Sequence, residues 1–455
     1  MHSMKVRILD GSVWKNIPKF AIPVALTGIL EQLFNAADIA VVGRFTGSEG
    51  TVNMAAVGAN SPVVGLILNV FIGVALGANV VIANAVGRKD EEAVQNAVHS
   101  SILFSLLAGV VVTLIGELAA TPLLTIMHAP ADVLPKAVLY LRIYLIGVPA
   151  ILLYNFESAI FRSVGETKVP LIALTLSGVL NVFLNLFLVI GLGRSVDGVA
   201  CATVLSNLIS SIFLFVLLMR TKLPIHVQVR SLRIEKNAIQ QVLQIGLPSG
   251  IQSGVFAIAN IVIQSAINSL GTKAIAASGA ALNIEIFCYD ILNSFSQACT
   301  TFVGQNFGAG NLQRCRKILK VCIIEGYITS GISIAVVLSW GRNLLSIFNT
   351  DPEVIELGYL KLCVIFAAYT FSMLYEVLSG YMRGFGISLV PAILTTIGVC
   401  GTRFFWIYAI FPRYHTFRVI MMVYPISLGL TAVLIGLALA YYHPTKRYKT
   451  VRHKV

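Results

Sequence analysis

Long apolar segments separated by short polar ones run along almost the whole chain. A helix crosses the hydrocarbon core of a membrane in about 20 apolar residues, and this length selects the segments of the chain that can span it. Twelve segments qualify: 20–43, 56–82, 95–118, 137–161, 169–193, 198–219, 242–269, 279–304, 319–340, 356–381, 388–411 and 418–442. The pattern predicts an all-α integral membrane protein with twelve transmembrane helices.

Composition points to the same class. Of 455 residues 57% are hydrophobic and 12% are charged, and the mean hydropathy is +0.84. A soluble chain carries about 25% charged residues, so a soluble protein is excluded. The first span retains Glu31 and Asp38 and lacks a small-residue cleavage site, so we expect it to stay in the protein and not to be a cleaved signal peptide.

The basic residues predict an orientation. If both termini face the cytoplasm, 23 of the 33 lysines and arginines fall on the cytoplasmic side, as the positive-inside rule requires. We therefore expect a multi-pass plasma-membrane protein with cytoplasmic termini. The basic tail HPTKRYKTVRHKV is expected to contact lipid headgroups, and no nucleic-acid partner is expected. The seven cysteines are never spaced as CxxC, so we expect them to be small packing residues. We expect no cofactor.

An internal repeat relates the two halves of the chain. At an offset of 221 residues, YNFESAIFRSVGETKVP (154–170) aligns with YEVLSGYMRGFGISLVP (375–391), which pairs Arg162 with Arg383. Six spans per half bring both halves in from the same side, so the repeat is parallel and the two six-helix lobes are pseudo-symmetric. The predicted parts are an N-terminal lobe 1–220, a cytoplasmic connector 221–241, a C-terminal lobe 242–442 and the cytoplasmic tail 443–455.

Parallel six-helix repeats are typical of transporters, because two similar lobes can alternate around a shared site. The chain contains no GxxxxGK[ST] phosphate loop, so ATP is not the expected energy source. An ion gradient then needs cation-binding or protonatable groups inside the membrane. A membrane enzyme or receptor with an occluded ligand is the alternative from another class.

Polar side chains form a stripe on the first span. Glu31, Asn35 and Asp38 are spaced i, i+4 and i+7, which places them on one helix face. A bare charge at the bilayer centre costs at least about 3 kcal/mol, so this face is expected to meet a cavity or another helix. A cation or proton site is favoured, and an interhelical hydrogen-bonding seam is the alternative.

Further polar residues within the spans are candidates for a substrate cavity. Together with Glu31 and Asn35 they are Glu157, Asn260, Gln264, Glu285, Asp290 and Glu376. Arg403 also lies within a span, where it either pairs with a carboxylate of its lobe or extends to the interface; the sequence leaves both open.

Over nearly its full length the chain resembles the multidrug and toxic compound extrusion (MATE) family. In the first half the resemblance rests on LFNAADIAVVGRF, ALGANVVIANAVGRKD, YNFESAIFRSVGETKVPL and LNVFLNLFLVIGLG with GVACAT. In the second half it rests on GLPSGIQS, TTFVGQNFGAGN and YMRGFGISLVP, in the same order and at the repeat spacing.

The resemblance implies an antiporter that exchanges H⁺ or Na⁺ for small organic, often cationic, compounds, working as a monomer. The family's first-lobe ion site falls on five positions, Asp38, Asn155, Asn181, Asn185 and Thr203, with Na⁺ at Asp38 as the possible metal ion. The family pattern often has Asp where this chain has Asn185, which leaves the choice between H⁺ and Na⁺ open. A lipid-linked precursor flippase of the same superfamily is the alternative within transport.

Overall fold

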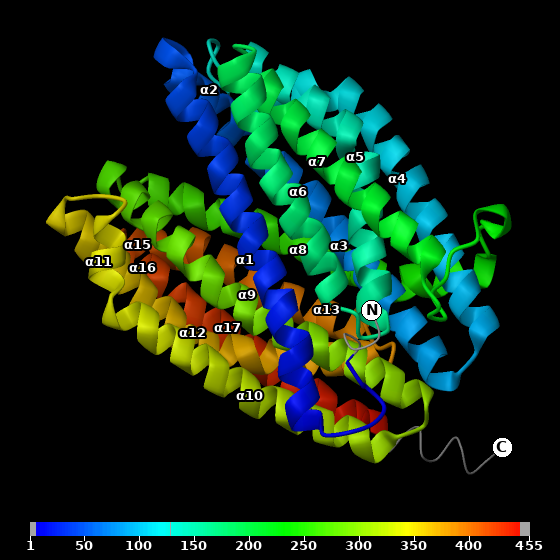
Figure 1. Cartoon of the computed structure of the whole chain (residues 1–455). Helices are drawn as coiled ribbons and strands as arrows, with labels where there is room; N and C mark the ends of the chain where they lie inside the picture. Colours follow the sequence, from blue (N-terminus) through cyan, green and yellow to red (C-terminus); the bar gives the residue numbers. More distant parts are fainter. Residues whose placement is uncertain (1–5, 128, 446–455) are drawn as a thin grey trace. The chain divides into compact units, whose positions relative to one another are not determined.

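The computed structural model describes residues 6–127 and 129–445, and in these residues the chain is helical throughout and contains no strand (Figure 1). Twelve helical stretches of the described chain are long and apolar enough to cross a membrane. The predicted all-α fold with twelve membrane spans is therefore confirmed. Part of the predicted basic tail, residues 446–455, lies outside the described residues.

Six of the spans come from the first half of the chain. They are α1 (Val13–Phe45), α2 (Gly50–Ala59) continued by α3 (Ser61–Arg88), α4 (Glu91–Ile126), α5 (Leu134–Ser163), α6 (Lys168–Leu186) with the π-helical η2 (Phe187–Gly191), and α7 (Val196–Arg220).

The other six spans come from the second half. They are α8 (Lys236–Asn268), α9 (Thr272–Gly308), α10 (Leu312–Ser339), α12 (Pro352–Gly384), a composite helix over Leu389–Tyr414, and α16 (Phe417–Met421) continued by α17 (Val423–Tyr442). The composite helix contains α13 (Leu389–Thr395), the π-helical η4 (Thr396–Gly401), α14 (Thr402–Phe405), the π-helical η5 (Trp406–Ile410) and α15 (Phe411–Tyr414). A short helix, α11 (Gly341–Ser346), precedes α12.

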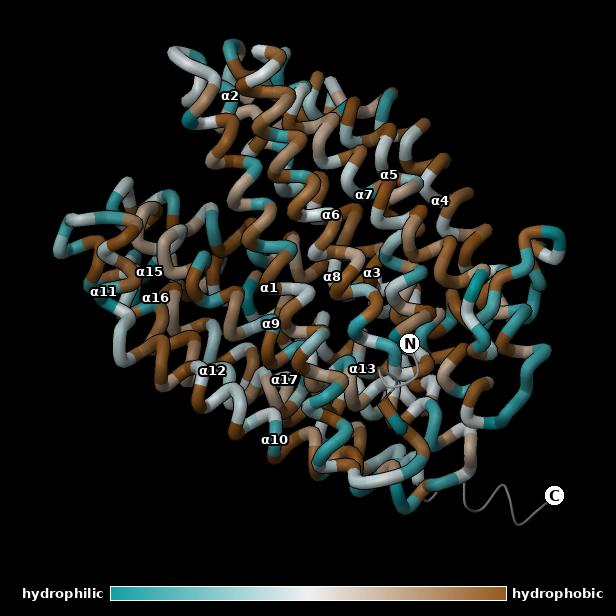
Figure 2. Tube along the Cα trace, viewed as in Figure 1, coloured by the Kyte–Doolittle hydropathy of each residue, from teal (hydrophilic) through white to brown (hydrophobic). Residues whose placement is uncertain are grey.

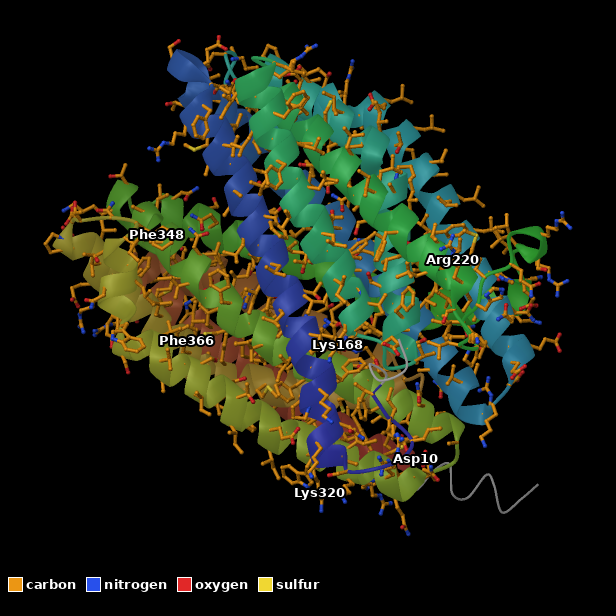
Figure 3. The ribbon with its side chains drawn as sticks, viewed as in Figure 1. Asp10, Lys168, Arg220, Lys320, Phe348 and Phe366 are labelled. Atoms are coloured by element: carbon orange, nitrogen blue, oxygen red, sulfur yellow. The ribbon has the colours of Figure 1, made fainter. Side chains whose placement is uncertain are left out.

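Polar residues set the ends of these helices, along which brown residues are interspersed with white and teal ones in Figure 2. Asp90 accepts a hydrogen bond from the backbone N–H of Ala93 at 3.0 Å and so caps α4. Lys168 begins α6 and Arg220 ends α7 (Figure 3). These capping and charged residues lie a few residues outside the apolar runs. The helices reach them, so most helices are a few residues longer at each end than the spans predicted from hydropathy.

The described chain divides into two compact units. The first contains 26–82 and 90–243, and the second contains 6–25, 83–89 and 244–445. These units differ from the predicted lobes at the start of α1 and the end of α3, which both belong to the second unit. The connector up to residue 243 belongs to the first unit. The assignment of two functional lobes stays a prediction.

In the first unit α5 packs against both α4 and α7. The contact with α4 is close at Gly109, where an added Cβ would lie 2.5 Å from the Cα of Pro149. α6 packs against α7, which brings polar positions of these two helices together. This pairing positions the site described below.

The connector is bound to the N-terminal turns of α4. The side chain of Gln95 donates to the carbonyl of Pro224 at 2.6 Å, and the backbone N–H of Gln228 donates to Nε2 of His99 at 3.2 Å. The backbone N–H of Glu235 donates to Oγ of Ser100 at 2.8 Å. The connector is thus a packed part of the first unit.

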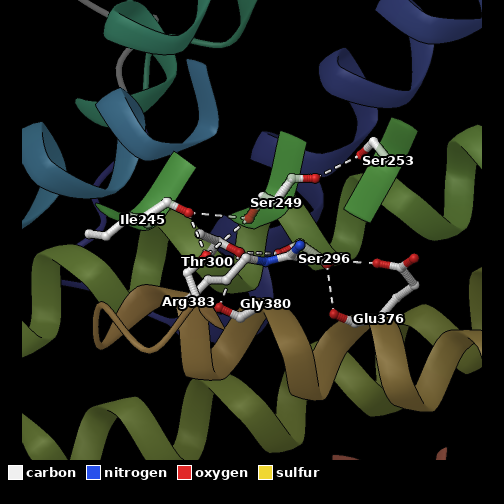
Figure 4. A network of polar contacts seen from close by, with 9 residues as sticks. Ile245, Ser249, Ser253, Ser296, Thr300, Glu376, Gly380 and Arg383 are labelled. Carbon is white, nitrogen blue, oxygen red and sulfur yellow. Dashed lines mark hydrogen bonds and ion pairs between the residues drawn. The ribbon is translucent and has the colours of Figure 1, made fainter. Parts of the chain in front are cut away.

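In the second unit the main contact is between α9 and α12, and α17 packs on the other side of α12. Figure 4 shows the polar network that joins α9 to α12. Ser296 donates to the backbone carbonyl of Glu376 at 2.8 Å, and Thr300 lies 3.1 Å from the carbonyl of Gly380. The absence of a side chain at Gly380 permits this approach, since an added Cβ would lie 2.6 Å from the carbonyl oxygen of Ser296.

Two repeat-related glycines make matching contacts within the second unit. A Cβ on Gly87 would lie 2.0 Å from the carbonyl oxygen of Gln305, and a Cβ on Gly308 would lie 2.1 Å from that of Asn84. These two positions are 221 residues apart, the offset of the internal repeat. The reciprocal contact is the arrangement that a twofold relation between equivalent helices produces.

Candidate functional site

Asp38 of α1 lies inside the first unit, where its side chain is 6% exposed. Each carboxylate oxygen has its own hydrogen-bond donor. Nδ2 of Asn185 in α6 lies 2.5 Å from Oδ1, and Oγ1 of Thr203 in α7 lies 3.0 Å from Oδ2. Three helices thus converge on one carboxylate, and among the described residues no lysine or arginine forms an ion pair with it.

Two asparagines of α6 complete this cluster. Asn185 also donates to Oδ1 of Asn181 at 3.1 Å, and Nδ2 of Asn181 lies 3.5 Å from Oγ1 of Thr203. The Oδ1 atom of Asn185 is buried and has no hydrogen-bond partner in the described chain. A buried carbonyl oxygen without a donor is costly, so this oxygen is suited to a cation.

The backbone of α6 changes directly after the cluster. The α-helix ends at Leu186, and the π-helical turn η2 covers Phe187–Gly191. Turns of this type are rare and often occur at functional sites, because the wider turn changes the direction of nearby side chains.

Thr203 can switch between two hydrogen-bond acceptors. Its Oγ1 lies 3.0 Å from Oδ2 of Asp38 and also 3.0 Å from the backbone carbonyl of Val199. A hydroxyl donates one hydrogen at a time. When Asp38 is ionised the hydroxyl can donate to it, and when Asp38 is protonated the carboxyl can donate to Thr203 while Thr203 donates to Val199.

The cluster therefore offers two kinds of chemistry. A proton can bind to Asp38 with little rearrangement beyond the Thr203 hydroxyl. Alternatively, carboxylate, amide and hydroxyl oxygens from Asp38, Asn181, Asn185 and Thr203 form the all-oxygen set that hard cations prefer.

Other acidic or polar candidates of the first unit lie outside these hydrogen bonds. Glu31 is half-buried and Asn35 is exposed, although both share a face of α1 with Asp38. Glu157 of α5 is fully buried, and Oγ of Ser211 donates to its Oε2 at 3.2 Å. The Oε1 atom of Glu157 has no hydrogen-bond partner in the described chain.

The second unit contains a different set of buried charges. Tyr369 donates to Oε1 of Glu285 at 2.9 Å, and Nζ of Lys361 lies 3.9 Å from Oε2 of the same carboxylate. Elsewhere Arg403 donates to Oδ1 of Asn260 at 2.6 Å.

Three further candidates of the second unit are spread along its helices. An ion pair of 3.7 Å joins Arg383 to Glu376. Gln264 donates to Asn268 of its own helix at 2.8 Å, and Asp290 is half-buried.

Comparison with known proteins identifies the family. The family model described as MatE matches residues 23–187 and 248–409. The chain belongs to the MatE family. The two matched ranges correspond to the two halves of the internal repeat, so each half carries the family pattern.

Curated relatives of this MatE-family chain are multidrug resistance proteins by name. The probable multidrug resistance protein YoeA of Bacillus subtilis is 27% identical over 399 residues, which cover 86% of each chain. The probable multidrug resistance protein NorM of Thermotoga maritima is 27% identical over 398 residues, covering 86% of this chain and 84% of NorM. A crystal structure titled "MATE in the bent conformation" matches with a TM-score of 0.88 at 23% identity over 98% of both chains. The fold is thus the two-lobe, twelve-helix fold of MATE transporters.

The structure of this MatE-family chain brings together four of the five positions that the resemblance implied. Asp38, Asn181, Asn185 and Thr203 are hydrogen-bonded to one another. Asn155 is half-buried and donates to the carbonyl of Ile151 in its own helix at 2.9 Å. Its role in the site stays a prediction.

Lys361 is a buried cation that the sequence analysis did not single out. It is 3% exposed and donates to the carbonyl and the hydroxyl of Ser278, both at 3.1 Å. Its position inside the apolar run of α12 was the available signal. In the described chain Arg403 neither pairs with a carboxylate nor extends to the surface, the two alternatives that the sequence left open. Its hydrogen-bond partner is an amide and its side chain is buried.

Proposed function

We propose that the protein is a secondary antiporter that exports organic, cationic compounds in exchange for H⁺ or Na⁺ by alternating access. The observation that carries this proposal is the buried Asp38 carboxylate, held by Asn185 and Thr203 without a basic partner among the described residues. A buried carboxylate without a cation is costly, so it favours uptake of a proton or a metal cation.

Binding of the coupling ion changes the charge of the site, and the two states differ in their hydrogen bonds. With Asp38 ionised, its two oxygens accept from Asn185 and Thr203. After a proton or Na⁺ binds, the net charge is neutralised and the hydroxyl of Thr203 is free to donate to Val199. A difference in charge and hydrogen bonding between two states is what allows an ion to shift a conformational equilibrium.

Glu31 has a separate role in this proposal. It lies seven residues before Asp38, which corresponds to about 10.5 Å along a helix axis, too far for both carboxylates to bind one bare cation. Its half-buried position gives a solute access that Asp38 lacks. We assign Glu31 to the attraction of cationic substrates or to proton relay toward Asp38.

The same proposal places the protein as a monomer in the plasma membrane, with both termini in the cytoplasm. The excess of basic residues on that side supports the orientation. Labelling of single cysteines introduced at residue 15 and residue 236 in intact cells tests it, since both are expected to react only after the membrane is permeabilised.

The test of function is transport by the purified protein in proteoliposomes. A pH gradient and a Na⁺ gradient are imposed separately, and efflux of a fluorescent organic cation such as ethidium is followed. Efflux driven by one gradient and abolished by its collapse supports antiport and identifies the ion. Absence of gradient-driven movement of any tested cation, together with a tightly bound stoichiometric ligand, favours an enzyme or receptor instead.

A further inference from the structure

Arg403 is the least expected charge in the second unit. It belongs to the four-residue helix α14 in the middle of an apolar span, and its side chain is 2% exposed. Its guanidinium lies over two aromatic rings, 4.8 Å from the centre of Phe256 and 4.9 Å from that of Tyr424. The aromatic faces and the lack of exposure show that the charge does not extend to a membrane interface.

The guanidinium has more donors than the structure uses. Arginine carries five N–H donors, and the hydrogen bond to Asn260 engages NH1. The Nε atom is buried without a hydrogen-bond partner in the described chain. Among the described residues no carboxylate lies within ion-pair distance of Arg403.

The nearby acid is already engaged. Glu285 lies within electrostatic range of Arg403, but its two oxygens are occupied by Tyr369 and Lys361. Glu376 in turn is paired with Arg383. A buried charge without a directly paired counter-charge is destabilising, and a protein retains one at a cost in stability.

The backbone around Arg403 is irregular on both sides. The π-helical η4 covers Thr396–Gly401 directly before α14, and the π-helical η5 covers Trp406–Ile410 directly after it. Each π-turn widens the helix and is energetically less favourable than an α-turn, so two of them around one arginine indicate a positioned side chain. At the repeat offset of 221 residues, the π-helical η2 of the first unit corresponds to 408–412, which overlaps the end of η5.

Asn260 is the exposed neighbour of the buried guanidinium. This residue of α8 is exposed on the second unit, and its carbonyl oxygen is the group that now accepts from Arg403. Displacement of this one side chain presents at least two N–H donors, on a guanidinium whose planar fork matches carboxylate and phosphate oxygens.

We propose that Arg403 anchors an anion subsite in the second unit, which binds the carboxylate, sulfonate or phosphate group of an organic substrate. The proposal rests on the proposed transport function and adds a substrate class to it: compounds with an acidic group, including those that also carry a positive charge. Asn260 is the internal group that occupies the subsite when no anion is bound.

The experiment measures equilibrium binding of two dyes with the same xanthene scaffold to the purified protein in phosphatidylcholine nanodiscs. The anion is carboxyfluorescein and the cation is rhodamine 6G. The variant Asn260→Asp places a carboxylate of the same size beside Arg403, so it should weaken carboxyfluorescein binding at least about tenfold and raise the melting temperature. Arg403→Gln should weaken anion binding to the same extent, and Arg403→Lys should retain part of it.

Matched controls are available on the same helices. Asn268→Asp adds the same carboxylate to α8 two turns away, and Arg413→Gln removes an exposed charge from the same span as Arg403. Neither should change carboxyfluorescein affinity by more than about twofold. Rhodamine 6G affinity should not fall in any of the Asn260 and Arg403 variants, since adding a negative charge or removing a positive one does not weaken the binding of a cation.

Equal carboxyfluorescein affinity in the wild type and in Asn260→Asp overturns the anion subsite, whether or not ion-driven efflux is found. The reverse result, a selective loss of anion binding in a protein that transports neither dye, supports the subsite and overturns the antiporter. Competition by phosphatidylglycerol that disappears in Asn260→Asp supports the subsite and assigns it to a lipid headgroup. Asn260 is exposed, so this test does not depend on the folding of an Arg403 variant.

Discussion

Asn185 donates a hydrogen bond of 2.5 Å to Asp38, a residue 147 positions earlier in the chain. The contact fixes α6 against α1 at the only buried carboxylate that α1 carries in the described chain. It also explains why an asparagine is suitable at position 185. The amide nitrogen of Asn185 donates a hydrogen bond to Asp38, and the amide oxygen stays free for a cation. A second carboxylate at this position could donate to Asp38 only if it were itself protonated.

Thr203→Val tests the second donor to Asp38. Loss of a hydrogen bond to a charged group costs about 1.5–3 kcal/mol, so affinity for the coupling ion should change about tenfold or more. Ion binding is measured by calorimetry on the purified protein. Thr203→Ser keeps the hydroxyl and should behave like the wild type; equal affinity in the Val variant would show that Thr203 only packs.

Glu31→Gln separates the two carboxylates of α1. Because Glu31 lies about two helical turns from Asp38, the variant should weaken binding of an organic cation and leave binding of the coupling ion largely unchanged. Both affinities are measured on the same preparation. Equal loss of both means one shared site, and loss of neither means that Glu31 is a packing residue.

The reciprocal glycine contact predicts a pattern of stability. Gly87→Ala and Gly308→Ala each place a Cβ about 2 Å from a backbone carbonyl oxygen, which should lower the free energy of unfolding by about 1–3 kcal/mol. Gly58→Ala and Gly279→Ala, also a repeat-related pair, have no atom within 4 Å of the added Cβ. Thermal unfolding in detergent compares the four, and equal effects in both pairs would contradict the close packing.

The parallel repeat predicts that Arg162 and Arg383 lie on the same side of the membrane. Arg383 is buried, so the test uses the exposed repeat-related positions Lys168 and Leu389, which follow Arg162 and Arg383 by six residues each. Cysteines introduced at these two positions into a cysteine-free protein should react with an impermeant maleimide from the cytoplasmic side only. Opposite sidedness of the two positions rules out a parallel repeat.

Hydropathy was enough to predict the twelve spans, because each must bury about 20 apolar residues in lipid. Periodicity placed Glu31, Asn35 and Asp38 on one face of α1, yet only Asp38 is buried in the polar cluster. Residues on one helix face lie at different heights along the helix axis, and each contacts the neighbouring helices at its own height. The neighbours of Asp38 come from α6 and α7, and periodicity within α1 contains no information about these helices.

The second unit shows the same limit for Arg403. Its partners, Asn260, Phe256 and Tyr424, come from two other helices, and its position depends on two π-turns. Such turns form where packing outweighs local propensity, so a single sequence does not predict them. The resemblance to a family supplied the Asp38 cluster for the opposite reason, because it carries tertiary information from other chains.

We propose that Asp38 binds the coupling ion, and the decisive measurement is gradient-driven efflux from proteoliposomes by Asp38→Asn. The substitution keeps the volume of the side chain and removes its charge and its ability to bind a proton. We expect a folded protein with wild-type yield and melting temperature that still binds an organic cation but moves none of it under a pH or a Na⁺ gradient. Efflux by Asp38→Asn at a rate close to that of the wild type, driven by the same gradient, would show that Asp38 does not bind the coupling ion.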